Sequence, residues 1–387
     1  MAIPPGGDAL TAEAHADGML LYLERGRAQA MQLGNRGPIR FGPDGGLHSD
    51  IREAFSRVGF YVFEGVIAAV ELAELRADNE RVLERAPIAP DARVDARGRP
   101  ALGLDFSRPT FSFAAPLSDP IGGTAKAQGR HPVKMLEPRP APDAPAQIVE
   151  MLFGNLQTMD SCLRLYGHPQ LLAVAEAIHG PDFLPSDEGT VLKDPGLGTS
   201  VAWHQDGTTY WDSPDWDELA HGFNFMAQLY WSTPGNGVWA LPGSHRQGKL
   251  DIEKLARESG SERLEGAVPM LAGPGDVILA NRQLVHGSFA NTSAERRVSP
   301  TFGFLARRRV LGVSNVNLSG VEQSYDAERV HARARMIAVA VDARQQRFPD
   351  EPRYVYQPFA GEEDGYRWSE ATRETLVKDY NLLDFHI

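Results

Sequence analysis

The feature that most constrains the fold is a series of short, β-like segments between residues 183 and 304. They are rich in apolar residues and are separated by Gly, Pro, Asn and Asp. The segments lie at 189–193, 223–231, 237–241, 276–280 and 285–290. Short strands joined by turns are typical of antiparallel β-sandwiches and barrels. The sequence therefore predicts a mainly β fold in this region.

Helices are expected on both sides of this β-rich stretch. Apolar periodicity predicts them at 18–33, near 51–58, at 69–84, at 168–179 and at 327–345. Ser49 or Asp50 is expected to cap the second helix. We predict three parts: an N-terminal extension at 1–47, a β-rich domain at 48–310, and a helical C-terminal extension at 311–387 packed on that domain.

An irregular insertion is expected within the domain at about 86–146. The segment is rich in Pro and Gly and has little sustained periodicity, which fits either a lid-like binding loop or a disordered linker. Its basic residues could meet an anionic substrate, with solvated surface charge as the alternative. These are Arg99, Arg108, Arg130 and Lys134.

Composition excludes several classes of site. Cys162 is the only cysteine of the 387 residues, so one chain cannot form a disulfide, a cysteine-rich zinc site or an iron-sulfur cluster. We expect Cys162 to be buried. The formal net charge of −12 argues against a nucleic-acid partner. The sequence has no secretory signal and no apolar run of about 20 residues, so we expect a cytoplasmic protein without a membrane partner.

Three His-x-Asp pairs are candidates for binding a metal. The pairs are His15/Asp17, His48/Asp50 and His204/Asp206. The first lies in the extension, and helix capping accounts for the second. If the third pair is on an extended strand, its two side chains project from the same face and can bind one cation.

His286 is the candidate third ligand, in the segment GDVILANRQLVHGSFANTSAERRVS. Iron(II) held by two imidazoles and one carboxylate keeps open positions for oxygen and a chelating co-substrate. His245, in the sequence PGSH, is expected to be a turn residue or to support the ligands rather than bind the metal.

An anion-binding arginine is expected next to the metal. Strand alternation places His286 and Ser288 on one face, and the polar run 291–295 predicts a turn into an antiparallel partner strand. We expect Arg297 to lie opposite Ser288 on that partner, where its guanidinium could hold the distal carboxylate of a dicarboxylate. Arg296 would face the other way and is the second choice.

Four sequence blocks together resemble the phytanoyl-CoA dioxygenase (PhyH-like) family of Fe(II)/2-oxoglutarate-dependent oxygenases. The resemblance covers residues 51–305 in order and spacing. The blocks are AFSRVGFYVFEGVI, LKDPGLGTSVAWHQD, NGVWALPGSHRQG and GDVILANRQLVHGSFANTSAERR.

The resemblance implies a double-stranded β-helix, a cupin-like jelly-roll barrel with flanking helices, as the oxygenase domain. It places the catalytic iron ligands at His204, Asp206 and His286. It selects Arg297 over Arg296, because the co-substrate arginine of the family lies eleven residues after the distal histidine. It also implies co-substrate contacts for Ser288, Gln205 and Trp231.

The implied enzyme uses Fe(II), 2-oxoglutarate and O2 to hydroxylate an unactivated carbon of a small molecule. The carboxylate ligand favours hydroxylation over halogenation, and leaves desaturation, ring closure and epimerisation open. Candidate substrate contacts are Lys193, Thr208, Tyr210 and Trp211, with core packing as the alternative for the aromatic residues. A cupin-like hydrolase or isomerase using zinc or manganese, a non-catalytic binding barrel and a homo-oligomer also remain open.

Overall fold

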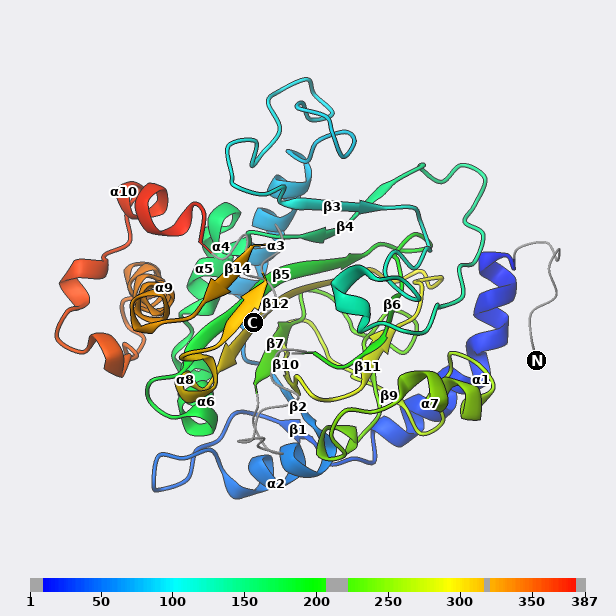
Figure 1. Cartoon of the computed structure of the whole chain (residues 1–387), viewed down its shortest axis with the longest axis horizontal. Helices are drawn as coiled ribbons and strands as arrows, with labels where there is room; N and C mark the ends of the chain where they lie inside the picture. Colours follow the sequence, from blue (N-terminus) through cyan, green and yellow to red (C-terminus); the bar gives the residue numbers. More distant parts are fainter. Residues whose placement is uncertain (1–9, 207–221, 317–320, 381–387) are drawn as a thin grey trace.

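Two mainly antiparallel sheets form the body of the protein, whose computed structural model describes residues 10–206, 222–316 and 321–380 (Figure 1). The large sheet has the strand order β1-β2-β10-β7-β12-β5-β4-β3, and the small sheet has the order β6-β11-β8-β9. The strands are β1 (Arg36–Gly37), β2 (Phe60–Phe63), β3 (Phe111–Ala114), β4 (Ile148–Leu152), β5 (Leu184–Lys193), β6 (Val201–His204), β7 (Phe223–Ala227), β8 (Trp239–Ala240), β9 (Val268–Pro269), β10 (Val277–Asn281), β11 (His286–Ser288), β12 (Arg297–Leu305), β13 (Ser314–Val316) and β14 (Glu322–Ser324).

The path of the chain from β5 to β12 is that of a jelly roll. β5, β7, β10 and β12 lie in the large sheet, whereas β6, β8, β9 and β11 lie in the small sheet. Consecutive strands therefore cross repeatedly from one sheet to the other, which is the double-sheet arrangement of jelly rolls and cupins. The predicted fold class is confirmed. Within the described residues, the strands form two sheets rather than one closed barrel.

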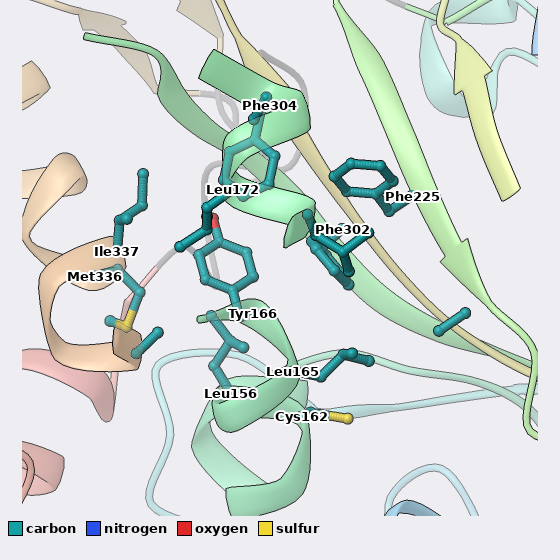
Figure 2. Packing of buried hydrophobic residues seen from close by; sticks show 14 of the residues in the cluster. Leu156, Cys162, Leu165, Tyr166, Leu172, Phe225, Phe302, Phe304, Met336 and Ile337 are labelled. Atoms are coloured by element: carbon teal, nitrogen blue, oxygen red, sulfur yellow. The ribbon is translucent and has the colours of Figure 1, made fainter. Parts of the chain in front are cut away.

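Helices cover the large sheet and close its core. The α-helices are α1 (Ala12–Ala30), α2 (Ser49–Val58), α3 (Ala69–Leu83), α4 (Asn155–Thr158), α5 (Asp160–Tyr166), α6 (Pro169–His179), α7 (Ile252–Ser259), α8 (Arg307–Val310), α9 (Ala327–Arg347) and α10 (Glu370–Thr372). α5 packs against α9, and α9 packs against β5. In this core Tyr166 lies between Phe302 of the sheet and Met336 of α9 (Figure 2). Cys162 is buried here, as predicted.

Two helix starts differ from the sequence-based expectation. α1 begins at Ala12 rather than near residue 18, because the Thr11 side chain accepts a hydrogen bond from the Ala14 amide and caps the helix. α2 is capped by His48, whose ring accepts from the Asp50 amide, and not by Ser49 or Asp50. The second His-x-Asp pair therefore has a local structural role.

The insertion is less irregular than predicted. Its segment Phe111–Ala114 forms β3, which extends the large sheet by pairing with β4. Four residues are too few to reveal strand periodicity in a sequence, which explains why this strand escaped prediction. The proposed division at 47, 86–146 and 310 stays a prediction. In the described part of the chain, no helix is both long and apolar enough to cross a bilayer.

Candidate metal centre

The His-x-Asp strand and the distal histidine meet through direct strand pairing. β6 and β11 are antiparallel neighbours, and their register places His286 opposite His204. The Nε2 atom of His204 lies 3.4 Å from Oδ1 of Asp206, and Nε2 of His286 lies 3.8 Å from Oδ2 of Asp206. One ligand atom from each of these residues lies within 4.8 Å of the others. These three residues are the metal cluster.

Outward-facing neighbours fix which side chains of β6 enter the sandwich. The Trp203 indole is fully buried among apolar residues and donates to the Glu262 carbonyl over 2.6 Å. The Gln205 amide donates to the carbonyls of Gly248 and Gln283. Because side chains alternate along a strand, anchoring residues 203 and 205 outside turns 204 and 206 inward.

Gly287 allows the close approach of β6 and β11. A Cβ atom at this position would lie 2.9 Å from the carbonyl oxygen of Val201 and 3.1 Å from the amide nitrogen of Trp203. Any side chain there would push the two ligand-bearing strands apart. The glycine of the HGS block therefore maintains the spacing between His204 and His286.

Backbone carbonyls orient both imidazoles. Nδ1 of His204 lies 2.8 Å from the Ala202 carbonyl, and Nδ1 of His286 lies 2.9 Å from the Leu284 carbonyl. A carbonyl can only accept, so each Nδ1 carries the proton and donates it. This leaves the Nε2 lone pair of each ring facing the cluster, which is the tautomer that a metal ligand needs.

Asp206 is held as a carboxylate. Burial alone would raise its pKa, but the nearby rings of His204 and His286 and the positive charge of Arg130 hold the pKa well below its ordinary value. Asn224 of β7 also donates to Oδ2 over 3.0 Å. Burial, followed by the charge of His204, lowers the pKa of His286 to about 4. With Nδ1 of each ring bound to a backbone carbonyl, both Nε2 atoms and the carboxylate face one point, where they can bind a divalent cation.

A second group, which we call the cationic cluster, comprises Lys193, Ser288 and Arg297. Arg297 of β12 pairs in register with Lys193 of β5. The Lys193 ammonium donates to Ser288 Oγ over 2.7 Å and to the Phe289 carbonyl over 2.5 Å. Ser288 is two residues from His286 on β11, so this cluster adjoins the metal cluster from the facing sheet.

The predicted pairing of Ser288 with Arg297 is wrong. β11 pairs with β6 and β8 in the small sheet, whereas β12 pairs with β5 and β7 in the large sheet. The turn near 291–295 exists, since Asn291 binds the Glu295 carbonyl, but it carries the chain across the sandwich. Strand alternation shows which face a side chain occupies, and it does not show which sheet the strand joins. Lys193 links the two residues instead.

The cations of this cluster lack an acidic partner. Lys193 and Arg297 are buried, and no carboxylate of the described residues lies within ion-pair distance of either. Burial, and then the Arg297 charge, hold the pKa of Lys193 well below its ordinary value, while Glu150 opposes this effect. Burial lowers the pKa of Arg297 to about 10, and its Nε has no hydrogen-bond partner. An anion is needed to complete this site.

Gln205 and Trp231 have other surroundings than those predicted. The Gln205 amide nitrogen donates to two carbonyls, and its oxygen accepts from the Leu250 amide, so the residue is used to hold loops. The Trp231 side chain is 62% exposed and lies against Gly273. Thr208, Tyr210 and Trp211 lie outside the described residues. His245 lies in a short 3-10 turn and contacts the Ser56 carbonyl of α2, as expected for a turn residue.

Part of this chain matches a known protein family. The family model of phytanoyl-CoA dioxygenase (PhyH) matches residues 139–299. Residues 139–299 are a PhyH domain. The PhyH domain contains both clusters, and the predicted resemblance to this family is confirmed.

One relative shares part of this domain. Phytanoyl-CoA dioxygenase 1 of Oryza sativa subsp. japonica is 32% identical over 117 residues, which are 28% of this chain and 39% of the rice protein. The matched part thus spans about two fifths of that relative's length.

Solved structures with similar chains include EctD from S. alaskensis with 2-oxoglutarate and 5-hydroxyectoine. It is 22% identical, with a TM-score of 0.47, and the alignment covers 73% of this chain and 83% of EctD. AviO1 from Streptomyces viridochromogenes Tue57 is 22% identical, with a TM-score of 0.45, covering 66% of this chain and 93% of AviO1. Neither likeness assigns a substrate to this protein.

Two residues at the metal cluster were not predicted. Asn224 is a polar residue in the apolar strand FNFMA, and that interruption is a signal that sequence reasoning could have used. His131 of the insertion packs on His204 with ring centroids 4.1 Å apart. No pattern around His131 indicates this contact, since it depends on how the insertion folds back.

Proposed function

We propose that this protein is an Fe(II)/2-oxoglutarate-dependent dioxygenase that hydroxylates an unactivated carbon of a small molecule. In this reaction 2-oxoglutarate, O2 and the substrate C–H group give succinate, CO2 and the hydroxylated product. One oxygen atom enters succinate and the other enters the product, so the atoms balance. Desaturation, ring closure and epimerisation remain variants of the same proposal.

The metal cluster fits iron(II). Two neutral imidazoles and a carboxylate supply three ligands on one side of an ion, which leaves the other positions for the co-substrate and oxygen. His204, Asp206 and His286 would hold the metal, and Asn224 would orient the carboxylate. Bound iron would supply the redox chemistry of oxygen activation, which these side chains cannot perform themselves.

The cationic cluster is the observation that carries the proposal. A hydrolytic metal site has no need for two buried cations next to the metal, whereas 2-oxoglutarate has a second carboxylate to be held. Arg297 can bind that carboxylate through two charge-assisted hydrogen bonds, and the Ser288 hydroxyl can donate a third. Lys193 would compensate the remaining negative charge and position Ser288.

The chain would direct the reaction by orientation and by excluding water. The cationic cluster would bind one carboxylate of 2-oxoglutarate and so would position its keto-acid end toward the metal. The buried surroundings of both clusters limit access of water to the reacting groups. A small-molecule substrate, a cytoplasmic location and the three-part division of the chain remain part of this proposal.

The experiment is succinate release by the purified protein with Fe(II), 2-oxoglutarate and a panel of metabolites. We expect release that requires the metal, rises with the correct metabolite and disappears in His204→Ala. His331→Gln, on the exposed face of α9, is the matched control and should keep full release. Turnover of a metabolite without 2-oxoglutarate, supported by zinc or manganese, would instead indicate a hydrolase or isomerase. Failure to bind a divalent metal would indicate a non-catalytic barrel.

A further inference from the structure

Arg130 of the insertion reaches the metal cluster from outside the PhyH domain. Its Nη1 lies 3.7 Å from Oδ1 of Asp206, and its side chain is only 20% exposed. Its Nε is buried and has no hydrogen-bond partner in the described part of the chain. Among the described residues, Asp206 is the only carboxylate within ion-pair distance of Arg130. The guanidinium is therefore held at the site with most of its hydrogen-bonding capacity unused.

The loop that carries Arg130 is tied to the approach of β6. The Leu117 amide donates to the Leu197 carbonyl over 2.8 Å, and the Ser200 amide donates to the Ser118 carbonyl over 2.9 Å. Asp119 accepts from two backbone amides across the loop. The position of Arg130 thus follows from an ordered loop that is fastened just before the His-x-Asp strand.

His131, the next residue along the chain, also contacts the metal cluster. His131 is buried against the ring of His204, and its backbone carbonyl accepts from the Gly123 amide over 2.8 Å. The loop therefore covers one ligand with His131 while directing Arg130 to another.

The other three basic residues considered from the sequence have partners of their own. Arg99 pairs with Asp95, and Lys134 pairs with Glu137. The Arg108 guanidinium lies over the Phe153 ring, 4.2 Å from its centroid. Of the four basic residues considered from the sequence, Arg130 is the one that contacts the metal cluster.

Metal binding would remove the partner that Arg130 now has. A divalent cation bound to Asp206 would neutralise the carboxylate charge. The cation would also be a second positive charge close to the guanidinium. Two like charges in a partly buried site repel each other, and the repulsion is relieved when an anion lies between them. The distal carboxylate of 2-oxoglutarate is assigned to the cationic cluster and its keto-acid end to the metal, so the substrate is the remaining source of an anion for Arg130.

We propose that Arg130 is a specificity-determining residue that binds an anionic oxygen group, a carboxylate or a phosphate, on the substrate. This inference rests on the proposed function and narrows its substrate to anionic small molecules whose oxidised carbon lies near that group. The planar guanidinium suits such groups because it can donate two parallel hydrogen bonds. Since Arg130 precedes the PhyH domain, the selectivity belongs to the insertion of this chain.

The first test measures Co(II) affinity by calorimetry in the wild type, Arg130→Gln and the control Arg139→Gln, which changes an exposed arginine of the same insertion. Without added anion, Arg130→Gln should bind Co(II) about tenfold more tightly than the wild type, because a nearby positive charge is removed. Arg139→Gln should match the wild type. Equal affinities in all three proteins would overturn the proposal.

The second test adds butyrate or inorganic phosphate to the protein loaded with Co(II) and saturating 2-oxoglutarate. One of these probes should bind the wild type and Arg139→Gln, and its dissociation constant should rise at least about tenfold in Arg130→Gln. Arg130→Lys should bind it with intermediate affinity, which also controls for folding. The probe that binds distinguishes a carboxylate from a phosphate.

Three outcomes separate the possible failures. If Co(II) and 2-oxoglutarate bind normally but neither probe distinguishes Arg130→Gln from the wild type, this inference falls and the proposed function stands. The inference also falls alone if Arg130→Gln weakens 2-oxoglutarate instead, because Arg130 would then hold the co-substrate. If the wild type binds neither Co(II) nor 2-oxoglutarate, the proposed function and the inference fall together.

Discussion

At the metal cluster the buried acid has its partners within the protein, whereas the cationic cluster has two buried cations and no acid within ion-pair distance among the residues that the structure describes. Asp206 accepts from Asn224 and lies near Arg130 and two imidazoles. Arg297 and Lys193 face each other across β12 and β5, and their hydrogen bonds go to neutral groups such as the Asn236 carbonyl and Ser288.

This difference indicates which charges the protein supplies and which it receives. Burying an unpaired cation is costly, so a site that keeps two of them is complementary to an anion that arrives from solution. The metal cluster is complementary to a cation in the same sense. Together the two clusters would hold one metal ion and one elongated anion, with the metal at the metal cluster and a carboxylate at the cationic cluster.

The largest effect is expected from removing a metal ligand. His286→Ala should lower succinate release by at least about 10³-fold, because two ligands cannot hold the ion in a reactive geometry. Calorimetry with Fe(II) under anaerobic conditions should show the loss of metal binding. His331→Gln should leave both quantities unchanged. Retained metal binding in His286→Ala would remove the assignment of the third ligand.

The next largest effect is expected at the cationic cluster. Arg297→Gln should raise the dissociation constant of 2-oxoglutarate about 100-fold, since it removes charge-assisted hydrogen bonds worth about 2–3 kcal/mol. Co(II) affinity should not fall, which separates the two clusters. Arg296→Gln is the matched control, because Arg296 pairs with Glu80 and Asp194 instead. Equal 2-oxoglutarate affinities in the two variants would contradict the assignment of Arg297.

Lys193 predicts a pH dependence of stability. Its pKa in the folded protein lies below the ordinary value of 10.5, first because of burial and then because of Arg297. Between these two pKa values the unfolded chain binds one more proton than the folded protein, so this residue makes stability rise with pH. Below the folded pKa its contribution to the slope vanishes.

The measurement is urea unfolding of the wild type and Lys193→Met at neutral and alkaline pH. The wild type should gain stability relative to Lys193→Met as the pH rises through this window. Saturating 2-oxoglutarate should reduce that gain, because a bound carboxylate favours the charged lysine. A pH-independent difference in stability between the two proteins would show that folding does not lower the pKa of Lys193.

The smallest effect on ligand binding is expected for Gln205. Gln205→Ala should lower the free energy of unfolding by about 1–3 kcal/mol, because three hydrogen bonds to backbone groups are lost. The dissociation constant of 2-oxoglutarate should change less than about twofold, since the amide is turned outward. A much larger change in co-substrate affinity, with little loss of stability, would restore the role that family resemblance suggested.

Sequence reasoning named all three residues of the metal cluster, because their spacing and block order can be read from the sequence. The spacing of His204 and Asp206 fixes a shared strand face, and the order of the four blocks supplies His286. It predicted the wrong strand pairing for Ser288 and Arg297, because strand pairing depends on how strands are distributed between sheets. It also failed for Arg130, where four basic residues looked alike until the fold gave three of them other contacts.

The most direct test of the two-cluster account is a crystal structure of the protein grown without oxygen, with Fe(II) and 2-oxoglutarate. The account predicts one iron bound by His204, Asp206 and His286, and one 2-oxoglutarate whose distal carboxylate accepts hydrogen bonds from Arg297 and Ser288. An iron that His286 does not reach, or a 2-oxoglutarate whose distal carboxylate lies away from Arg297, would contradict it.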